Sequence, residues 1–309
     1  MSISIDTQSK VSVRMEQEPK RNLMKKFLQS ILQSKTGLVG LIIFLSVSFV
    51  AIFAGVLAPH DPTKTEVTMR LIPPMWVEGG SAEYPLGTDN LGRDLLSRLI
   101  YGSQVSLIVG IFAVCIAGAI GIVLGMVSGY FGGWTDRIIM RTVDAFIAIP
   151  NLLLLLVIMM IAGPGVFTVI FVLGVTSWTS YARVIRGEVL SIKEREFVKA
   201  SRALGAKNFR IIFTHILPNV LPTFIVISTT SVATAIISES SLSFLGMGVQ
   251  APTVTWGNIL SDGRQYLATS WWIATFPGIA ITLTVLGVIF LGDWLRDILD
   301  PRLKNNGAK

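Results

Sequence analysis

The sequence predicts an all-α membrane protein with six membrane-spanning helices, and three observations predict it. Only 15% of the 309 residues are charged, whereas 51% are apolar; an ordinary soluble domain has about 25% charged residues. The charges also avoid several runs that exceed the roughly 20 residues needed to cross a bilayer, namely 36–59, 99–135, 145–182, 211–238 and 265–292. Finally, Lys and Arg are unequally shared between the segments joining these runs. This composition excludes a soluble enzyme and a disordered chain.

The apolar runs and their breakers predict where each span lies. We expect spans at about 38–57, within 105–128, and at about 138–161, 166–181, 222–247 and 273–291. The turn Ala162-Gly163-Pro164-Gly165 separates the third span from the fourth. Pro150 lies inside the third span, where it removes a helical hydrogen bond and predicts a kink.

The basic residues predict the orientation. Six spans place both termini on one side, and the segments on that side carry 21 Lys and Arg against five on the other. By the positive-inside rule, both termini are expected in the cytoplasm. The predicted organisation is a basic tail, a first helix, an outer segment, a five-helix core and a second tail, at 1–35, 36–58, 59–102, 103–294 and 295–309.

The outer segment predicts a surface helix and an aromatic belt. Leucines at helical spacing within 86–102 predict an amphipathic helix on the outer face, capped by Gly87-Thr88-Asp89. Asp89, Arg93 and Asp94 are then close enough to form local ion pairs. Further along the chain, three tryptophans near the expected interface are typical of an interfacial belt: Trp256, Trp271 and Trp272.

The longest inner segment predicts a helical hairpin over 191–218. Ser191 and Glu194 form a capping-box pattern, and Gly205 suits a left-handed helix end. A second helix over 208–216 is expected to stop before Pro218. The first helix presents a narrow face of small and apolar residues, namely Phe197, Ala200, Ser201 and Leu204. Such a face fits a groove on another protein or rests on lipid, and its small residues favour the groove.

Several residues inside the spans have alternative interpretations. Gly121, Gly125 and Gly129, spaced by four, predict close helix packing, either within the chain or against a second subunit. Glu239, next to Ser240 and near Ser243, is either a pathway or gate residue or a carboxylate satisfied by serine hydroxyls or Arg264.

The remaining patterns predict one ion pair and argue against metal binding, disulfide formation and ATP binding by this chain. Asp144 is expected to pair with Arg141 at a helix end. His60 and His215 are the only histidines, which argues against a metal site, and the single cysteine, Cys115, supports neither a disulfide framework nor a thiol metal site. The chain has no phosphate-binding loop of the G-x-x-x-x-G-K-[ST] type. We therefore expect no catalytic residue, no metal and no cofactor in this chain.

The inner hairpin resembles the signature loop of the permease subunits of bacterial ATP-binding-cassette (ABC) importers. That loop reads Glu-Ala-Ala, three residues, Gly, nine residues, Ile-x-Leu-Pro, and the matching positions here are 199–201, Gly205 and 215–218. Lys199, Ser201 and His215 depart from the pattern, which puts a fixed ion pair of the motif's glutamate in doubt. Four further blocks make 36–304 resemble the C-type permease of dipeptide, oligopeptide and nickel importers: 86–94, 129–136, 239–246 with 256–257, and 291–304.

This resemblance implies a type I importer permease fold and a multi-subunit machine in the bacterial cytoplasmic membrane. The implied partners are a second permease, two cytoplasmic ATP-binding subunits that hydrolyse ATP, an extracytoplasmic binding protein and membrane lipid. Nucleic acid is not expected, because membrane topology accounts for the basic balance. The hairpin would couple to the ATPase through these residues: Glu196, Phe197, Lys199, Ala200, Ser201, Leu204, Gly205, Leu217 and Pro218.

Three functions remain open at this point. The first is a permease for dipeptides and oligopeptides, in which the outer helix either receives the binding protein or serves as a scaffold. The second is a permease of the same architecture for nickel or another metal chelate. The third is a stand-alone ion-coupled carrier or intramembrane enzyme, which the nearly charge-free spans disfavour.

Overall fold

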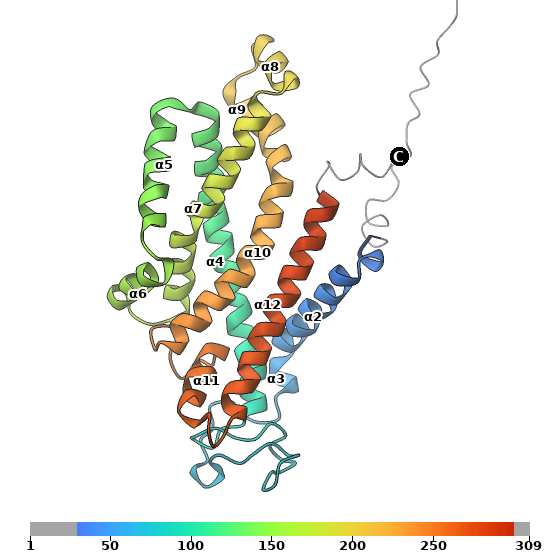
Figure 1. Ribbon diagram of the computed structural model, residues 1–309, viewed down its shortest axis with the longest axis vertical. Helices are drawn as coiled ribbons and strands as arrows, with labels where there is room; N and C mark the ends of the chain where they lie inside the picture. The colour runs from blue at the N-terminus through green and yellow to red at the C-terminus, as the bar shows by residue number, and fades with distance from the viewer. Residues whose placement is uncertain (1–29, 300–309) are drawn as a thin grey trace, which may run out of the picture.

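The computed structural model describes residues 30–299, and helices dominate that range (Figure 1). The first helices are α2 (Lys35–Ile52), α3 (Ala54–Leu57), α4 (Leu95–Phe131), α5 (Gly133–Ala148), α6 (Asn151–Ala162) and α7 (Val166–Lys193). The remaining helices are α8 (Glu196–Ala203), α9 (Asn208–Ile211), α10 (Leu217–Phe244), α11 (Trp256–Gly263) and α12 (Trp272–Leu299). Short helical turns lie at Val67–Met69, Ile212–Ile216 and Arg264–Tyr266. The predicted all-α class is confirmed.

Five helices in the described range are long and apolar enough to cross a membrane, and a bent pair makes a sixth candidate. The bent pair is α5 and α6, which meet at 91°. The sequence predicts a kink at Pro150; the structure instead has a full break, in which Ile149 and Pro150 leave the helix. The predicted position of the bend, at Pro150, is confirmed, and the bend is sharper than a kink. Figure 1 shows α6 at the edge of the bundle, below α5 and roughly perpendicular to it.

The centre of the bundle is the pair α4 and α7, which run side by side. α4 begins at Asp94, whose carboxylate accepts a hydrogen bond from the Ser97 N–H at 2.8 Å. It ends at Gly132, which has a positive φ of 66°. The predicted outer helix over 86–102 is wrong in its start, because 86–94 is a loop and the helix from Leu95 continues directly into the second span.

The inner hairpin also differs from the prediction at both ends. α7 continues through Ser191 to Lys193, because Val189 and Ile192 are buried against its neighbours, so the predicted capping box does not start a helix. α8 starts at Glu196 instead. The prediction that the second helix ends before Pro218 is wrong. A π-helical turn over Ile212–Ile216 leads into α10, where Pro218 occupies a first-turn position that needs no helical N–H partner.

The tryptophan belt is also wrong for two of its three members. Trp256 and Trp272 are buried, and their indole N–H groups donate to the Leu99 and Thr88 carbonyls. Only Trp271 is exposed. The two buried indoles join the start of α11 to α4 and the start of α12 to the loop before α4, so they hold this end of the fold together.

Candidate coupling surface and membrane site

The tip consists of α8, α9 and the following helical turn. One side of it is buried against α7 and α10, and the other side is exposed. Val198, Ile211 and Ile216 are fully buried in a cluster with α7 and α10 residues. Their neighbours point outward: Leu204 is 89% exposed and Phe209 is 72% exposed. Figure 1 shows α8 at the extreme end of the molecule. The tip therefore has a buried base and an exposed apolar surface.

Gly205 sets the turn at this tip. Its φ is +81°, a region that favours glycine. Its N–H donates to the Arg202 carbonyl at 3.0 Å, and the Ala206 N–H donates to the Ser201 carbonyl at 3.1 Å. This is the Schellman arrangement of a helix end, and it agrees with the left-handed cap predicted from the sequence.

The predicted coupling residues occupy two different places. Glu196, Phe197, Lys199 and Ala200 are exposed on α8, and Ser201 is partly exposed. Leu217 and Pro218, by contrast, begin α10 and lie outside the α8–α9 tip.

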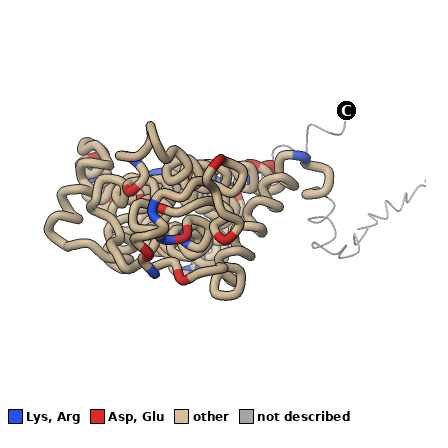
Figure 2. The backbone as a smooth tube through the Cα atoms, turned by 90° about the horizontal axis from the view of Figure 1, so that it is seen from below, with Lys and Arg blue, Asp and Glu red and all other residues tan. Residues whose placement is uncertain are grey.

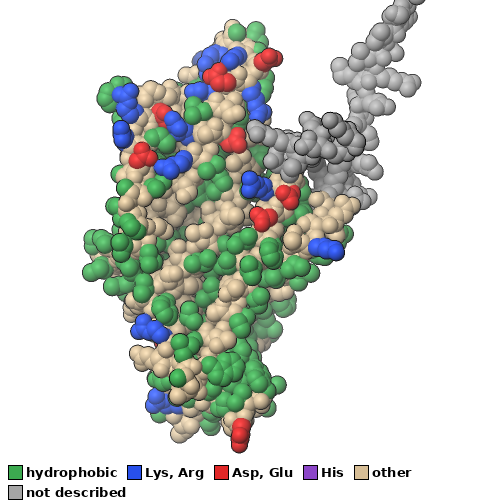
Figure 3. Space-filling view, in the orientation of Figure 1, with side chains coloured by type: hydrophobic (Ala, Val, Ile, Leu, Met, Phe, Trp, Pro, Cys, Tyr) green, Lys and Arg blue, Asp and Glu red, His purple; other side chains and the backbone are tan. Residues whose placement is uncertain are grey.

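Charged side chains surround the tip. Lys199 pairs with Glu194 at 3.0 Å, and this ammonium lowers the pKa of Glu194 below its ordinary value. Figure 3 shows Lys and Arg gathered at this end of the molecule. The exposed basic residues next to the apolar tip are Arg195, Lys199, Arg202, Lys207 and Arg210. The rim is therefore mainly basic.

Tyr130, which the sequence analysis missed, links the tip to α4. Its hydroxyl donates to Asn208 Oδ1 at 2.8 Å, and the Arg202 guanidinium lies 5.7 Å from its ring centroid. Lys193 Nζ also donates to the Gly129 carbonyl of α4 at 2.9 Å. These contacts tie α7, α8 and α9 to the end of α4. The partners are far apart in sequence, so no local pattern predicts them.

Gly121, Gly125 and Gly129 all face α7. A Cβ on Gly121 would lie 2.2 Å from Tyr181 Cβ, and one on Gly125 would lie 2.8 Å from the Ala182 carbonyl oxygen. Gly129 approaches Val189 in the same way. The three glycines therefore make their close approach inside this chain, which allows the α4 and α7 backbones to lie side by side.

Two ion pairs join α5 to α7 near the same end. Asp136 accepts hydrogen bonds from Arg186 Nε at 2.5 Å and Nη2 at 2.7 Å, and from the Ser128 hydroxyl at 2.5 Å. Asp144 pairs with Arg183 at 3.1 Å. The predicted pair of Asp144 with Arg141 is wrong, because α7 supplies a closer guanidinium.

Glu239 is fully buried within α10. It accepts hydrogen bonds from Ser243 at 2.8 Å and Ser240 at 3.4 Å. Of the two structural partners considered from the sequence, the serines are present, whereas the Arg264 guanidinium lies 5.4 Å from the Phe244 ring centroid. Ser240 and Ser243 pack closely against Gly257 of α11.

A cavity of about 340 Å³ lies beside the break between α5 and α6, and α4, α7 and α10 complete its wall. No Asp, Glu, Lys, Arg or His belongs to this wall. Its polar side chains are an amide and seven hydroxyls: Asn151, Thr176, Ser177, Thr179, Ser180, Ser231, Thr234 and Ser238. The sequence analysis missed this site. The available signal was the repeated Ser and Thr of α7 and α10 within runs without charge.

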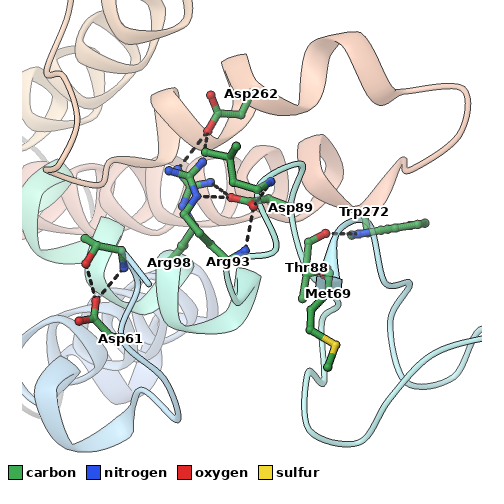
Figure 4. A network of polar contacts seen from close by, with 10 residues as sticks. Asp61, Met69, Thr88, Asp89, Arg93, Arg98, Asp262 and Trp272 are labelled. Carbon is green, nitrogen blue, oxygen red and sulfur yellow. Dashed lines mark hydrogen bonds and ion pairs between the residues drawn. The ribbon is translucent and has the colours of Figure 1, made fainter. Parts of the chain in front are cut away.

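At the end of the molecule opposite α8, a network of ion pairs joins α4 and the loop before it to α11 (Figure 4). Asp89 is buried and accepts hydrogen bonds from Arg98 and, at 2.6 Å, from Arg93 Nε. Both arginines also reach Asp262 of α11, at 3.0 and 3.1 Å. The predicted pairing of Asp89 with Arg93 is thus confirmed, while Asp94 caps α4. Figure 2, which views this end, shows basic and acidic segments near its middle.

Comparison with known proteins defines the class. A sequence model of the family described as binding-protein-dependent transport system inner membrane component matches residues 121–305. A second model, for the N-terminal TM domain of oligopeptide transport permease C, matches 22–74. The chain belongs to the family of inner membrane components of binding-protein-dependent transport systems. It is a multi-pass permease and not itself an enzyme, and the predicted resemblance is confirmed.

Individual relatives cover nearly the whole chain. It is 43% identical to the di/tripeptide transport system permease protein DppC of Pseudomonas aeruginosa, over 91% of this chain and 93% of that protein. It is 44% identical to the dipeptide transport system permease protein DppC of Escherichia coli K12, over 91% and 94%. It is 39% identical to the oligopeptide transport system permease protein OppC of Bacillus subtilis, over 92% and 91%.

A solved structure shows the same fold. An inward-facing conformation of the MetNI methionine ABC transporter contains a chain that matches with a TM-score of 0.56 at 21% identity, covering 67% of this chain and 98% of that one. This likeness confirms the predicted type I importer permease fold.

Proposed function

We propose that this chain is a permease subunit of an ABC importer that carries dipeptides and oligopeptides across the cytoplasmic membrane. The observation that carries the proposal is the 43% identity to a di/tripeptide permease along 91% of the chain. The proposed partners are a second permease, two cytoplasmic ATP-binding subunits and an extracytoplasmic binding protein. ATP hydrolysis belongs to the ATP-binding subunits.

The tip formed by α8 and α9 is the proposed contact with the ATP-binding subunit. Its apolar residues are exposed although its base is buried, which is the arrangement of a helix that docks in a groove. The tip's basic rim fits a groove edged with carboxylates. The basic residues at this end also support its placement in the cytoplasm, together with both termini.

For Glu239, Ser240 and Ser243 we propose a structural role near the pathway. All three are buried, and the serine hydroxyls donate to the carboxylate. A buried carboxylate needs such partners because an unpaired one is costly at membrane depth. In this arrangement, the group fixes α10 against α11 and does not contact the substrate.

Reconstitution tests the proposed function. This chain, the second permease and the two ATP-binding subunits are placed in liposomes with binding protein and labelled dipeptide, and uptake is measured with and without ATP. We expect uptake only with ATP and all partners present. Full-speed uptake by this chain alone would contradict the proposal, and ATP-driven uptake of nickel without peptide uptake would assign the chain to a metal importer.

Gly205 provides the variant that tests coupling. Gly205→Pro forces a negative φ at a position with φ +81°, so the tip should lose its turn and uptake should fall to background. Gly205→Asn is the matched control, because asparagine tolerates the left-handed region, and it should retain most uptake. Equal uptake by the proline variant and the wild type would contradict the coupling role.

A further inference from the structure

We propose that the cavity beside the break of α5 and α6 binds the backbone of a peptide in transit through hydrogen bonds that do not depend on the peptide's sequence. The inference rests on the proposed function, because it names the substrate contacts of a peptide permease. It concerns a site that is separate from the tip, Glu239 and the outer charge network.

The position of the cavity is the first argument. The 91° break interrupts the helical hydrogen bonds of a candidate membrane span, and the first N–H groups of α6 have no partner within their own helix. Irregular backbone at membrane depth is tolerated only where protein buries it or where it lines a water-filled cavity. Ile149, Pro150 and Asn151 are exposed and line the cavity. The break therefore indicates a wetted space.

The second argument is the unused hydrogen-bonding capacity of the wall. Thr176 and Thr234 donate to carbonyls of their own helices, at 2.8 and 3.2 Å. By contrast, Asn151, Thr179 and Ser180 make no side-chain hydrogen bond to another residue in the range 30–299. Polar groups at this depth are expected to have partners. Water or a passing substrate would supply them.

The third argument is the match to peptide chemistry. Every peptide bond offers an N–H donor and a C=O acceptor, except before proline, and a hydroxyl can serve either group. A wall without charged side chains forms no ion pair with the side chains of the cargo. The volume of about 340 Å³ lies at the lower end of the range for small-molecule sites. These properties fit a short peptide held by its backbone.

Placing charge in the cavity gives the sharpest test. Thr234→Asp and Thr234→Lys are made in the complete importer, and uptake of an acidic and a basic dipeptide is compared in liposomes. The acidic-to-basic uptake ratio should fall by about tenfold with Asp and rise by a similar factor with Lys, as one close charge contact predicts. Opposite shifts cannot result from a general folding defect. An unchanged ratio in both variants, at measurable uptake, would overturn the inference.

Removing hydroxyls provides a test that does not add charge. Thr179→Val and Ser180→Ala each delete one donor, and we expect each to slow uptake roughly fivefold, equivalent to about 1 kcal/mol. The loss should be equal for acidic, neutral and basic dipeptides. Thr282→Val is the control for deleting a hydroxyl elsewhere in the bundle, because Thr282 lies on α12, outside the cavity wall.

The outcomes separate this inference from the proposed function. If the wild-type importer takes up no peptide, the proposed function fails, and the inference fails with it. If the wild type is active and the Thr179 and Ser180 variants match the Thr282 control, only the inference is overturned. A loss confined to one charge class of peptide would also overturn it, because it would indicate side-chain recognition.

Discussion

The two ends of the molecule both use pairs of arginine and aspartate, but they bury them to different degrees. At the end opposite α8, Asp89 and Arg98 are almost completely buried, and Asp262 adds a second carboxylate. At the α8 end, Asp136 and Arg186 remain partly exposed, and the pair of Lys199 with Glu194 is exposed. The end with Asp89 is thus held by buried ion pairs, whereas the α8 end carries exposed ones.

The burial of an ion pair determines how much stability the fold loses when the pair is broken. Removing one partner of a buried pair leaves a charge without compensation, which typically costs about 3–5 kcal/mol. An exposed pair contributes little, because water screens it. The comparison therefore predicts how much stability is lost when each carboxylate is neutralised. The loss should be largest at Asp89, smaller at Asp136 and smallest at Glu194.

The largest effect is expected at Asp89. Asp89→Asn leaves Arg93 and Arg98 to share the single, partly exposed carboxylate of Asp262, so one guanidinium charge loses its partner. We therefore expect a loss of about 3 kcal/mol and a clearly lower melting temperature in detergent. Asp61→Asn is the control, since Asp61 is an exposed carboxylate in the loop before α4 whose hydrogen bonds from Thr63 are local. Equal melting temperatures for Asp89→Asn and Asp61→Asn would contradict a stabilising role of the ion-pair network around Asp89.

A smaller effect is expected at Asp136. Asp136→Asn weakens a two-bond contact with Arg186 that water partly reaches, so we expect about 1–2 kcal/mol. Thermal unfolding of the purified chain measures it. A loss as large as that of Asp89→Asn would remove the distinction between the two ends.

The smallest effect is expected at Glu194. The Lys199 ammonium lowers the pKa of Glu194 in the fold, so the pair stabilises above the ordinary glutamate pKa and this contribution is lost as the pH falls through the lowered value. Glu194 is exposed. We therefore expect Glu194→Gln to leave the melting temperature at pH 7 unchanged within error. A marked drop at pH 7 that disappears in acid would contradict this.

The sequence predicts the parts of this molecule that depend on local rules. Gly205 as a left-handed helix end follows from one residue type and its place after a helical pattern. The helix class follows from charge-free runs. The small-residue spacing of Gly121, Gly125 and Gly129 predicts close packing, although only the structure identifies α7 as the neighbour.

The remaining features depend on contacts distant in sequence. The capping-box pattern at Ser191 and Glu194 is overridden, because burying Ile192 favours a longer α7. The contact of Tyr130 with Asn208 joins residues 78 positions apart. The cavity near Asn151 exists only because α5 and α6 separate at a right angle, and a proline alone predicts a kink without its size.

The central claim is that the exposed tip transmits force from separate ATP-binding subunits, and the most direct measurement is their recovery with this chain. Ala200→Arg places a long charged side chain on the exposed face of α8, and Ser191→Arg adds the same charge to an exposed position on α7. Each variant is purified in mild detergent with the whole importer. We expect Ala200→Arg to reduce recovery of the ATP-binding subunits at least tenfold without lowering the melting temperature, and Ser191→Arg to retain them. Full recovery and normal ATP-driven uptake with Ala200→Arg would contradict the account.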